Sequence, residues 1–224
     1  MICTNCSQNL GPIAILDIDG TLGDYHKHFL RFAAMYLGID LMPPGRKMYT
    51  GSEGFREWFC ATFDTDTRVF RDIKLAYRQG AQKRSMPVFK HSRLLVSELR
   101  RAGAEIWLAT TRPYMRLDAV DPDTRFWLKR HGIKYDHMLY DDHKYELLSH
   151  QIDRDRVALV LDDQHDDLAE AEVFFGSSVC VLYANSWNSA FLPDWPSVDS
   201  EVVRPAMLEK VNEWNAKYSS SVPT

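Results

Sequence analysis

Apolar residues occur along this chain in short continuous runs, and each run stops at polar or turn-forming residues. Four runs resemble buried parallel strands and a fifth is weaker: residues 12–16, 105–109, 157–161, 179–183 and, as the weaker one, 137–140. Between them, apolar residues recur at helical spacing, each time shortly before a glycine, in residues 88–101, 123–130 and 168–175. Strands that alternate with helices predict a Rossmann-like three-layer α/β/α fold, with a parallel sheet between two layers of helices.

One interval departs from this alternation. Residues 24–87 contain no clear strand pattern; instead, three aromatic-rich stripes at helical spacing follow one another, in residues 25–36, 55–63 and, more loosely, 70–77. We interpret residues 24–87 as a small helical domain inserted after the first strand, and residues 1–23 and 88–224 as the main domain. A last helix is expected at residues 205–218.

The composition is that of an ordinary globular protein of 224 residues, with 45% apolar and 26% charged residues. No run approaches the roughly 20 apolar residues that a membrane-spanning helix needs. The first residues also lack the basic and then apolar segments of a signal peptide. We therefore expect a cytoplasmic protein with no membrane partner.

The four cysteines do not form a disulfide framework in a chain of this length. Cys3 and Cys6 make a Cys-x-x-Cys pair, which is half of a zinc site, but the sequence contains no second pair. A loose terminal segment is therefore the favoured interpretation of these two residues. Cys60 and Cys180 lie in apolar runs and are expected to be core thiols.

Charge is unevenly distributed along the chain. Residues 24–90 contain twelve Lys and Arg against seven Asp and Glu, which gives +5; since the whole chain carries −4, the remainder carries −9. A basic insertion over an acidic body suits an anionic substrate held above a metal-binding centre. An unevenly charged, solvated helical surface explains the same numbers equally well.

The run Ile13-Ala14-Ile15-Leu16 ends in Asp17 and Asp19, and Gly20 and Thr21 then turn the chain. A buried strand that ends in this way presents two carboxylates at the edge of a parallel sheet, where open α/β sheets bind their ligands. Two carboxylates so close together repel unless a divalent cation or a shared proton neutralises them. Mg²⁺ and chemistry on a phosphate are the interpretation that we favour over an ordinary strand followed by a turn.

Three later segments supply groups of the same kind. Thr110, Thr111 and Arg112 follow the second strand and can hold phosphate oxygens. Lys144 opens a helix and can pair with a carboxylate and a phosphate. Another strand ends in an acidic cluster that can complete an oxygen-rich cage for Mg²⁺, namely Asp162 and Asp163, followed by Asp166 and Asp167.

These motifs resemble those of the haloacid dehalogenase superfamily, in its phosphatase branch, over residues 12–185. The first motif is the run from Asp17 to Thr21; Thr110 matches the second, Lys144 the third and Asp162-Asp163 the fourth. The resemblance implies a catalytic core formed by the main domain and a cap of the first type (C1) formed by the insertion. Phosphatases of this superfamily usually carry Asp at the position of Asp19, whereas dehalogenases do not, so phosphoryl transfer to water is implied.

The resemblance also implies a role for each site residue. Asp17 would attack phosphorus and form an aspartyl-phosphate, and Asp19 would serve as general acid and then as general base. Thr110 and Lys144 would hold the phosphoryl oxygens. The Mg²⁺ ligands would be Asp17, the backbone carbonyl of Asp19, Asp162 and a further carboxylate, for which we favour Asp163 over Asp166 and Asp167.

The layout of the insertion resembles that of 5'-deoxyribonucleotidases, so a nucleoside monophosphate is the expected substrate. Aromatic residues of the insertion could stack on its base: Tyr25, Phe29, Trp58, Phe59 and Phe63. Thr111-Arg112-Pro113 and the segment 126–132 also resemble the 3'-phosphatase domain of polynucleotide kinases, which makes a nucleic-acid 3' end the second candidate. No Gly-x-x-x-x-Gly-Lys-Ser/Thr loop is present, so a kinase half is absent. A non-catalytic binding protein on the same fold is the third possibility.

Overall fold

A computed structural model describes residues 11–41, 49–50, 54–112, 117–188 and 197–219. Cys3, Cys6 and Pro113 lie outside these ranges. The strands are β1 Ile13–Leu16, β2 Glu105–Thr110, β3 His137–Tyr140, β4 Val157–Asp162, β5 Cys180–Tyr183 and β6 Ser197–Val198. The helices are α1 Tyr25–Leu37, α2 Phe55–Phe63, α3 Thr67–Gln79, α4 Ser92–Arg101, α5 Val120–Arg130, α6 Lys144–Ser149, α7 His165–Phe175 and α8 Val203–Ser219.

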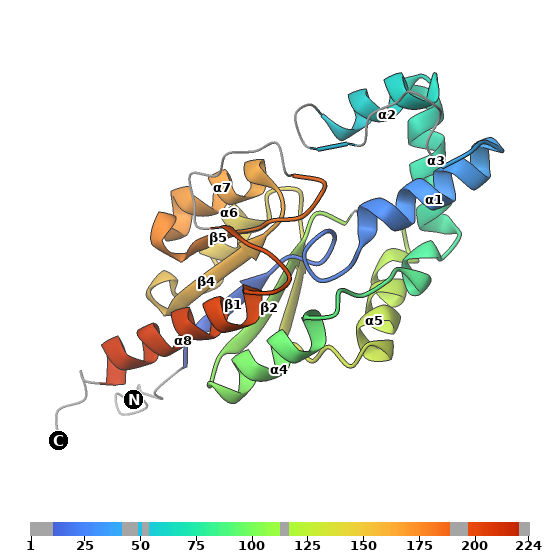
Figure 1. Cartoon of the computed structure of the whole chain (residues 1–224). Coiled ribbons are helices and arrows are strands. Elements are labelled where there is room, and N and C mark those ends of the chain that lie inside the picture. Colours follow the sequence, from blue (N-terminus) through green and yellow to red (C-terminus); the bar gives the residue numbers. More distant parts are fainter. Residues whose placement is uncertain (1–10, 42–48, 51–53, 113–116, 189–196, 220–224) are drawn as a thin grey trace, which may run out of the picture.

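The six strands form one parallel sheet in the order β3-β2-β1-β4-β5-β6 (Figure 1). The five strands expected from the apolar runs are confirmed. The sixth, β6, has only two residues, too few to produce a recognisable pattern. The order reverses direction between β1 and β4, and the crevice at such a point, beyond the carboxyl ends of the strands, is where sheets of this kind bind ligands.

Helices cover both faces of the sheet, as the alternation of strands and helices predicts. Successive residues of a strand point to opposite faces. Ala14 and Leu16 accordingly belong to an apolar core that includes residues of α4, α5 and α8, whereas Ile13 and Ile15 pack with residues of α6 and α7. The three-layer α/β/α architecture is therefore confirmed.

The helix expected from residue 88 begins only at Ser92. Val88 and Phe89 instead pair with the chain that leaves β1: Val88 forms an antiparallel bridge with Gly23, and the Phe89 N–H donates to the Leu22 carbonyl at 3.0 Å. The chain thus enters and leaves the insertion side by side. The proposed boundaries between the core and the cap lie at these two paired segments, near Gly23 and Val88. The division into two domains stays a prediction.

Helices α1, α2 and α3 lie together beyond the end of the sheet at which β1 leads into α1 (Figure 1). Their apolar faces meet in a cluster of buried aromatic side chains, which also receives Trp187 from the loop after β5. A short 3₁₀ helix, η1 Gln82–Ser85, leads the chain back toward the core. Among the described residues, no helix is long and apolar enough to cross a membrane.

Candidate active site

Asp17 and Asp162 lie next to each other at the carboxyl edge of the sheet. Leu16 of β1 is in register with Leu161 of β4, and the Asp17 N–H donates to the Leu161 carbonyl at 3.0 Å. Asp17 follows β1 and Asp162 ends β4, so the pairing of two central strands places both carboxylates at the point where the strand order reverses. The structure therefore brings the first and fourth motifs together.

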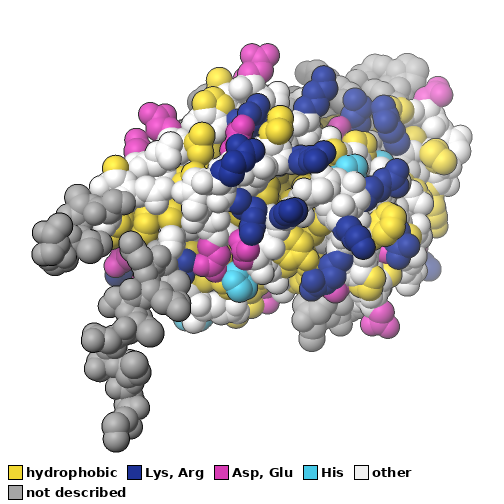
Figure 2. Space-filling view, turned by 90° about the horizontal axis from the view of Figure 1, so that it is seen from below, with side chains coloured by type: hydrophobic (Ala, Val, Ile, Leu, Met, Phe, Trp, Pro, Cys, Tyr) yellow, Lys and Arg dark blue, Asp and Glu magenta, His cyan; other side chains and the backbone are white. Residues whose placement is uncertain are grey.

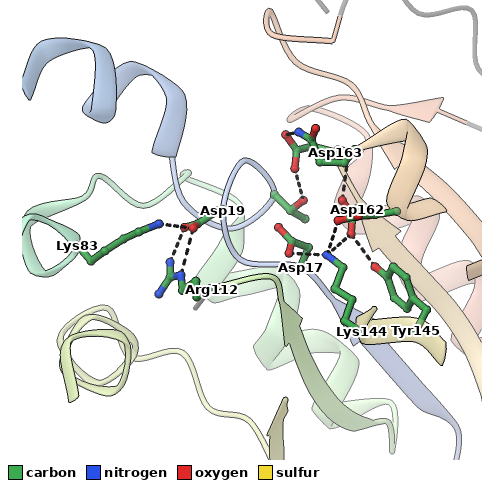
Figure 3. A network of polar contacts seen from close by, with 11 residues as sticks. Asp17, Asp19, Lys83, Arg112, Lys144, Tyr145, Asp162 and Asp163 are labelled. Carbon is green, nitrogen blue, oxygen red and sulfur yellow. Dashed lines mark hydrogen bonds and ion pairs between the residues drawn. The ribbon is translucent and has the colours of Figure 1, made fainter. Parts of the chain in front are cut away.

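Asp17, Asp162 and Asp163 form a buried carboxylate cluster, in which one oxygen from each residue lies within 4.8 Å of the others (Figure 3). Asp17 is 4% exposed, and Asp162 and Asp163 are fully buried. Burial and the charge of Asp162 raise the pKa of Asp17 to about 8, although Lys144 opposes this shift. Burial and the same neighbouring carboxylate also hold the pKa of Asp163 well above its usual range.

Lys144 is the cation that the structure places against this cluster. Its Nζ lies 2.8 Å from Asp17 Oδ1, 2.6 Å from Asp162 Oδ2 and 2.9 Å from an oxygen of Asp167. The side chain is fully buried, and the carboxylates more than compensate for that burial, so the pKa of Lys144 stays well above its usual range. Lys144 opens α6, as the sequence predicts.

One ammonium does not neutralise four neighbouring carboxylates, namely Asp17, Asp162, Asp163 and Asp167. Mg²⁺ prefers carboxylate and other oxygen ligands, and a hard cation beside Asp17, Asp162 and Asp163 would lower their mutual repulsion. The residues present therefore fit the expected ion. Asp166 is fully exposed at its side chain and Asp167 pairs with Lys144, so Asp163 is the carboxylate placed to complete the cluster.

Two further side chains, which the sequence does not single out, hold the acidic end of β4. Tyr145 is fully buried, and its hydroxyl donates to Asp162 Oδ2 at 2.6 Å. Gln164 donates its backbone N–H to Asp162 Oδ1 at 2.8 Å and its side-chain amide to Asp163 at 3.0 Å. These contacts fix the orientation of both carboxylates.

Gly20 allows the chain after Asp19 to turn close to the cluster. Its φ angle is +100°, a conformation that residues with a side chain rarely adopt. A Cβ atom at this position would lie 2.1 Å from Asp163 Oδ2. The glycine of the first motif is therefore required both by the backbone conformation and by the close approach of Asp163.

Asp19 lies apart from the carboxylate cluster and binds two cations (Figure 3). Arg112 reaches it with both Nε, at 3.1 Å, and Nη2, and Lys83 of η1 binds it from the insertion. Burial favours the neutral acid, but the charges of Arg112 and Lys83 outweigh it and hold the pKa of Asp19 well below its usual range. Arg112, which we predicted as a phosphate ligand, also donates to Thr124 Oγ1 at 2.6 Å.

The remaining predicted phosphate ligands lie at the end of β2. Thr110 is the last residue of this strand and is 1% exposed, whereas the next residue, Thr111, is exposed and lines a cavity. This cavity has a volume of about 310 Å³. Its walls combine residues of the sheet edge with residues of the insertion: Asp19, Thr111, Arg112, Gln164, Asp166 and Asp167 from the former, and Tyr25, His26, Phe55, Lys74, Arg78 and Lys83 from the latter.

No protein-family model matches the sequence, and no curated protein matches it. Solved structures do match. A predicted phosphatase from Clostridium acetobutylicum superposes with a TM-score of 0.61 at 16% identity, covering 89% of this chain and 99% of that one. A haloacid dehalogenase-like family hydrolase from Streptococcus pneumoniae gives 0.58 at 15% identity, with coverages of 88% and 99%. A HAD family hydrolase from Deinococcus radiodurans gives 0.59 at 14% identity, with coverages of 90% and 96%.

The chain has the haloacid dehalogenase-like fold. Asp17 directly follows β1, and Thr110 and Asp162 end β2 and β4, so all three lie at the carboxyl edge of its sheet.

Within this haloacid dehalogenase-like fold, only some aromatic residues of the insertion line the cavity; others are buried. Trp58 is 5% exposed, and Phe59 is fully buried between Phe63 and Phe70, with ring centroids 4.7 and 5.0 Å away. Of the five aromatic residues that the sequence suggested for base stacking, Tyr25 lines the cavity; Phe29, Trp58, Phe59 and Phe63 belong to the buried aromatic cluster. Phe55, which the sequence analysis did not select, lines the cavity as well.

Proposed function

We propose that this protein is a Mg²⁺-dependent phosphomonoester hydrolase that acts through an aspartyl-phosphate on Asp17. The observation that carries the proposal is the buried cluster of Asp17, Asp162 and Asp163 with Lys144 bound to the first two. Bound Mg²⁺ would supply Lewis-acid stabilisation of the phosphoryl oxygens and would be held by these three carboxylates and by the backbone carbonyl of Asp19. The Deinococcus hydrolase was crystallised with phosphate and sodium.

In the first step, a carboxylate oxygen of Asp17 attacks phosphorus, and the bond from phosphorus to the leaving oxygen breaks. Asp19 donates a proton to that oxygen, so an alcohol leaves. In the second step, Asp19 takes a proton from a water molecule that attacks the aspartyl-phosphate; inorganic phosphate leaves and Asp17 is restored. Lys144 and Thr110 stabilise the charge on the phosphoryl oxygens in both steps.

The contacts of Asp19 set a condition on this mechanism. Lys83 and Arg112 keep its carboxylate ionised, and an ionised carboxylate has no proton to give. A bound phosphate competes for the same two cations, because it offers them more negative charge than one carboxylate does. We infer that Arg112 and Lys83 turn from Asp19 to the substrate phosphate, which allows Asp19 to bind a proton.

A nucleoside monophosphate remains the substrate that we propose, in a cytoplasmic setting. Tyr25 and Phe55 line the same cavity as Asp19, and an aromatic side chain of this kind can stack on a nucleobase. The test is a Mg²⁺-dependent phosphate-release screen over nucleoside 5'-monophosphates, sugar phosphates and para-nitrophenyl phosphate. Preferential turnover of nucleotides supports the proposal, and a preference for sugar phosphates contradicts the nucleotide part. Absence of turnover on every compound favours the non-catalytic binding protein.

A polynucleotide 3'-phosphatase is the second candidate, and the surface of the core provides an observation in its favour. Lys and Arg side chains are widespread on the face shown in Figure 2. A hollow of about 370 Å³ near α4 is lined by four basic and no acidic side chains: Arg93, Arg100, Arg101 and Lys134. Basic surfaces of this kind bind phosphate backbones. Faster turnover of a 3'-phosphorylated oligonucleotide than of mononucleotides, decreasing steeply with salt, would favour this function.

A further inference from the structure

Lys74 and Arg78 lie one helical turn apart on α3, and both line the cavity that contains Asp19. Both side chains are half-buried. Lys74 packs over the Phe70 ring at 5.4 Å from its centroid. Within the part of the chain that the structure describes, no carboxylate forms an ion pair with either side chain. Two like charges at this spacing on a helix destabilise each other.

The acidic residues that line the cavity form no ion pair with Lys74 or Arg78, because they are engaged elsewhere or exposed. Asp19 is bound by Lys83 and Arg112, and Asp167 pairs with Lys144. Asp166 has a fully exposed side chain. Burial and the charge of Arg78 lower the pKa of Lys74 to about 8, and the charge of Asp19, which opposes this shift, does not cancel it.

Lys74 and Arg78 belong to the insertion, whereas the reacting groups belong to the core. Tyr25 and Phe55 line the same cavity and can contact the middle of a bound molecule. Resting on the phosphomonoester hydrolase activity proposed above, we propose a substrate other than a simple nucleoside monophosphate: its leaving group carries a second phosphate, which Lys74 and Arg78 bind while the first phosphate reacts at Asp17. The guanidinium offers a forked pair of donors and the ammonium a point charge, a combination suited to phosphate oxygens.

Two kinds of substrate carry a second anionic group of this kind. One is a small molecule with two phosphates, such as a nucleoside 3',5'-bisphosphate. The other is a 3'-phosphorylated oligonucleotide, in which the neighbouring phosphodiester is the second anionic group. Both place a negative charge beyond the sugar that carries the reacting phosphate. A nucleoside monophosphate has no second anionic group for Lys74 and Arg78 to bind.

The test is equilibrium binding, measured by isothermal titration calorimetry with Mg²⁺ on the Asp17→Asn variant and with EDTA on the wild type. The probes are deoxythymidine 3',5'-bisphosphate and the matched 3'- and 5'-monophosphates. Because the second phosphate would gain charge-assisted contacts with both Lys74 and Arg78, the bisphosphate should bind at least about tenfold more tightly than either monophosphate. Adding Lys74→Gln and Arg78→Gln should abolish this preference. Adding Arg68→Gln and Arg71→Gln, at exposed positions of the same helix, should preserve it.

Equal affinities for the bisphosphate and the monophosphates would overturn the inference, as would a preference that survives Lys74→Gln with Arg78→Gln. A 3'-phosphorylated dithymidylate provides the second arm: tighter binding than the bisphosphate identifies an oligonucleotide as the source, and weaker binding identifies the small molecule. The binding result does not depend on turnover. Failure of the wild type to release phosphate from any of these compounds or from para-nitrophenyl phosphate with Mg²⁺ would overturn the proposed function alone.

Discussion

Lys83 binds Asp19 across 64 positions of sequence and thereby joins the helical insertion to the loop after β1. Lys83 is 6% exposed, and its ammonium also lies 4.1 Å from the centroid of the Tyr25 ring. A residue of the insertion therefore controls the charge around the proposed general acid. In the proposed mechanism, the insertion therefore takes part in the chemistry.

Lys83→Met should lower kcat/KM for every phosphomonoester by about ten- to a hundredfold, within the range that general acid–base groups contribute. The reason is that the substrate phosphate would lose one of the two cations that we propose turn to it from Asp19. Arg112 remains bound, so the fold should tolerate the change. Phosphate-release kinetics on para-nitrophenyl phosphate and on a nucleotide measure the effect, with Lys90→Met, at an exposed lysine, as control. A loss confined to one substrate would show that Lys83 binds the leaving group instead.

Asp17→Asn should abolish phosphate release while the protein stays folded. The amide is nearly isosteric, but it removes both the nucleophile and a proposed metal ligand, so turnover should fall by several orders of magnitude. Burial raises the pKa of Asp17 despite its contact with Lys144, so the folded protein favours an uncharged side chain here and the melting temperature should not decrease. Activity within about tenfold of wild type, in preparations free of contaminating phosphatase, would contradict the assignment of the nucleophile.

Mg²⁺ should be required for turnover and should also stabilise the fold. Three buried carboxylates lie within 4.8 Å of one another, and a ligand that binds only the folded state raises its stability. EDTA should stop phosphate release, and Mg²⁺ should restore it better than Ca²⁺, whose coordination shell is looser. A melting curve provides a readout independent of activity: Mg²⁺ should raise the melting temperature of the wild type and have less effect on Asp163→Asn. Full activity after exhaustive chelation would be incompatible with the proposal.

Tyr145→Phe should weaken the response to Mg²⁺ without removing any direct ligand. Its hydroxyl donates to Asp162 at 2.6 Å, and groups that orient a metal ligand in this way typically contribute about ten- to a hundredfold in metal affinity. Titration of turnover against Mg²⁺ should therefore show a higher half-saturating concentration. Tyr135→Phe, a change at a half-buried tyrosine whose hydroxyl contacts Arg125, is the matched control. An unchanged Mg²⁺ titration would assign Tyr145 a role in packing alone.

The sheet and much of the candidate site could be predicted from the sequence because both depend on local patterns. Continuous apolar runs mark strands that are buried on both faces, and the candidate site residues stand at the ends of these strands: Thr110 and Asp162 end β2 and β4, and Asp17 directly follows β1. Parallel pairing then places these residues at one edge. Lys144 was found in the same way, as a charged residue at the start of a helix after a strand.

Contacts between distant segments could not be predicted. Lys83 is one of many basic residues in the insertion, and only the folded chain shows that it reaches Asp19. Tyr145 has the pattern of a core residue, which it also is. Val88 has the apolar character of the helix that follows it, but pairing with Gly23 keeps it extended. In each case the partner lies far away in sequence, so no local pattern specifies the contact.

Phe59 is buried in the aromatic cluster, whereas Phe55 lines the cavity. Variants at these two positions can therefore distinguish core packing from substrate recognition. Phe59 is fully buried, so Phe59→Ala should lower the free energy of unfolding by about 3–5 kcal/mol, and turnover of a nucleotide and of para-nitrophenyl phosphate should fall together. Phe55 is half-buried and lines the cavity, so Phe55→Ala should lower kcat/KM for the nucleotide more than for the small aryl ester. Thermal melts run beside both assays distinguish the two effects. Equal losses on both substrates for Phe55→Ala, with a lowered melting temperature, would place Phe55 in the core and leave Tyr25 as the aromatic residue to test for base stacking.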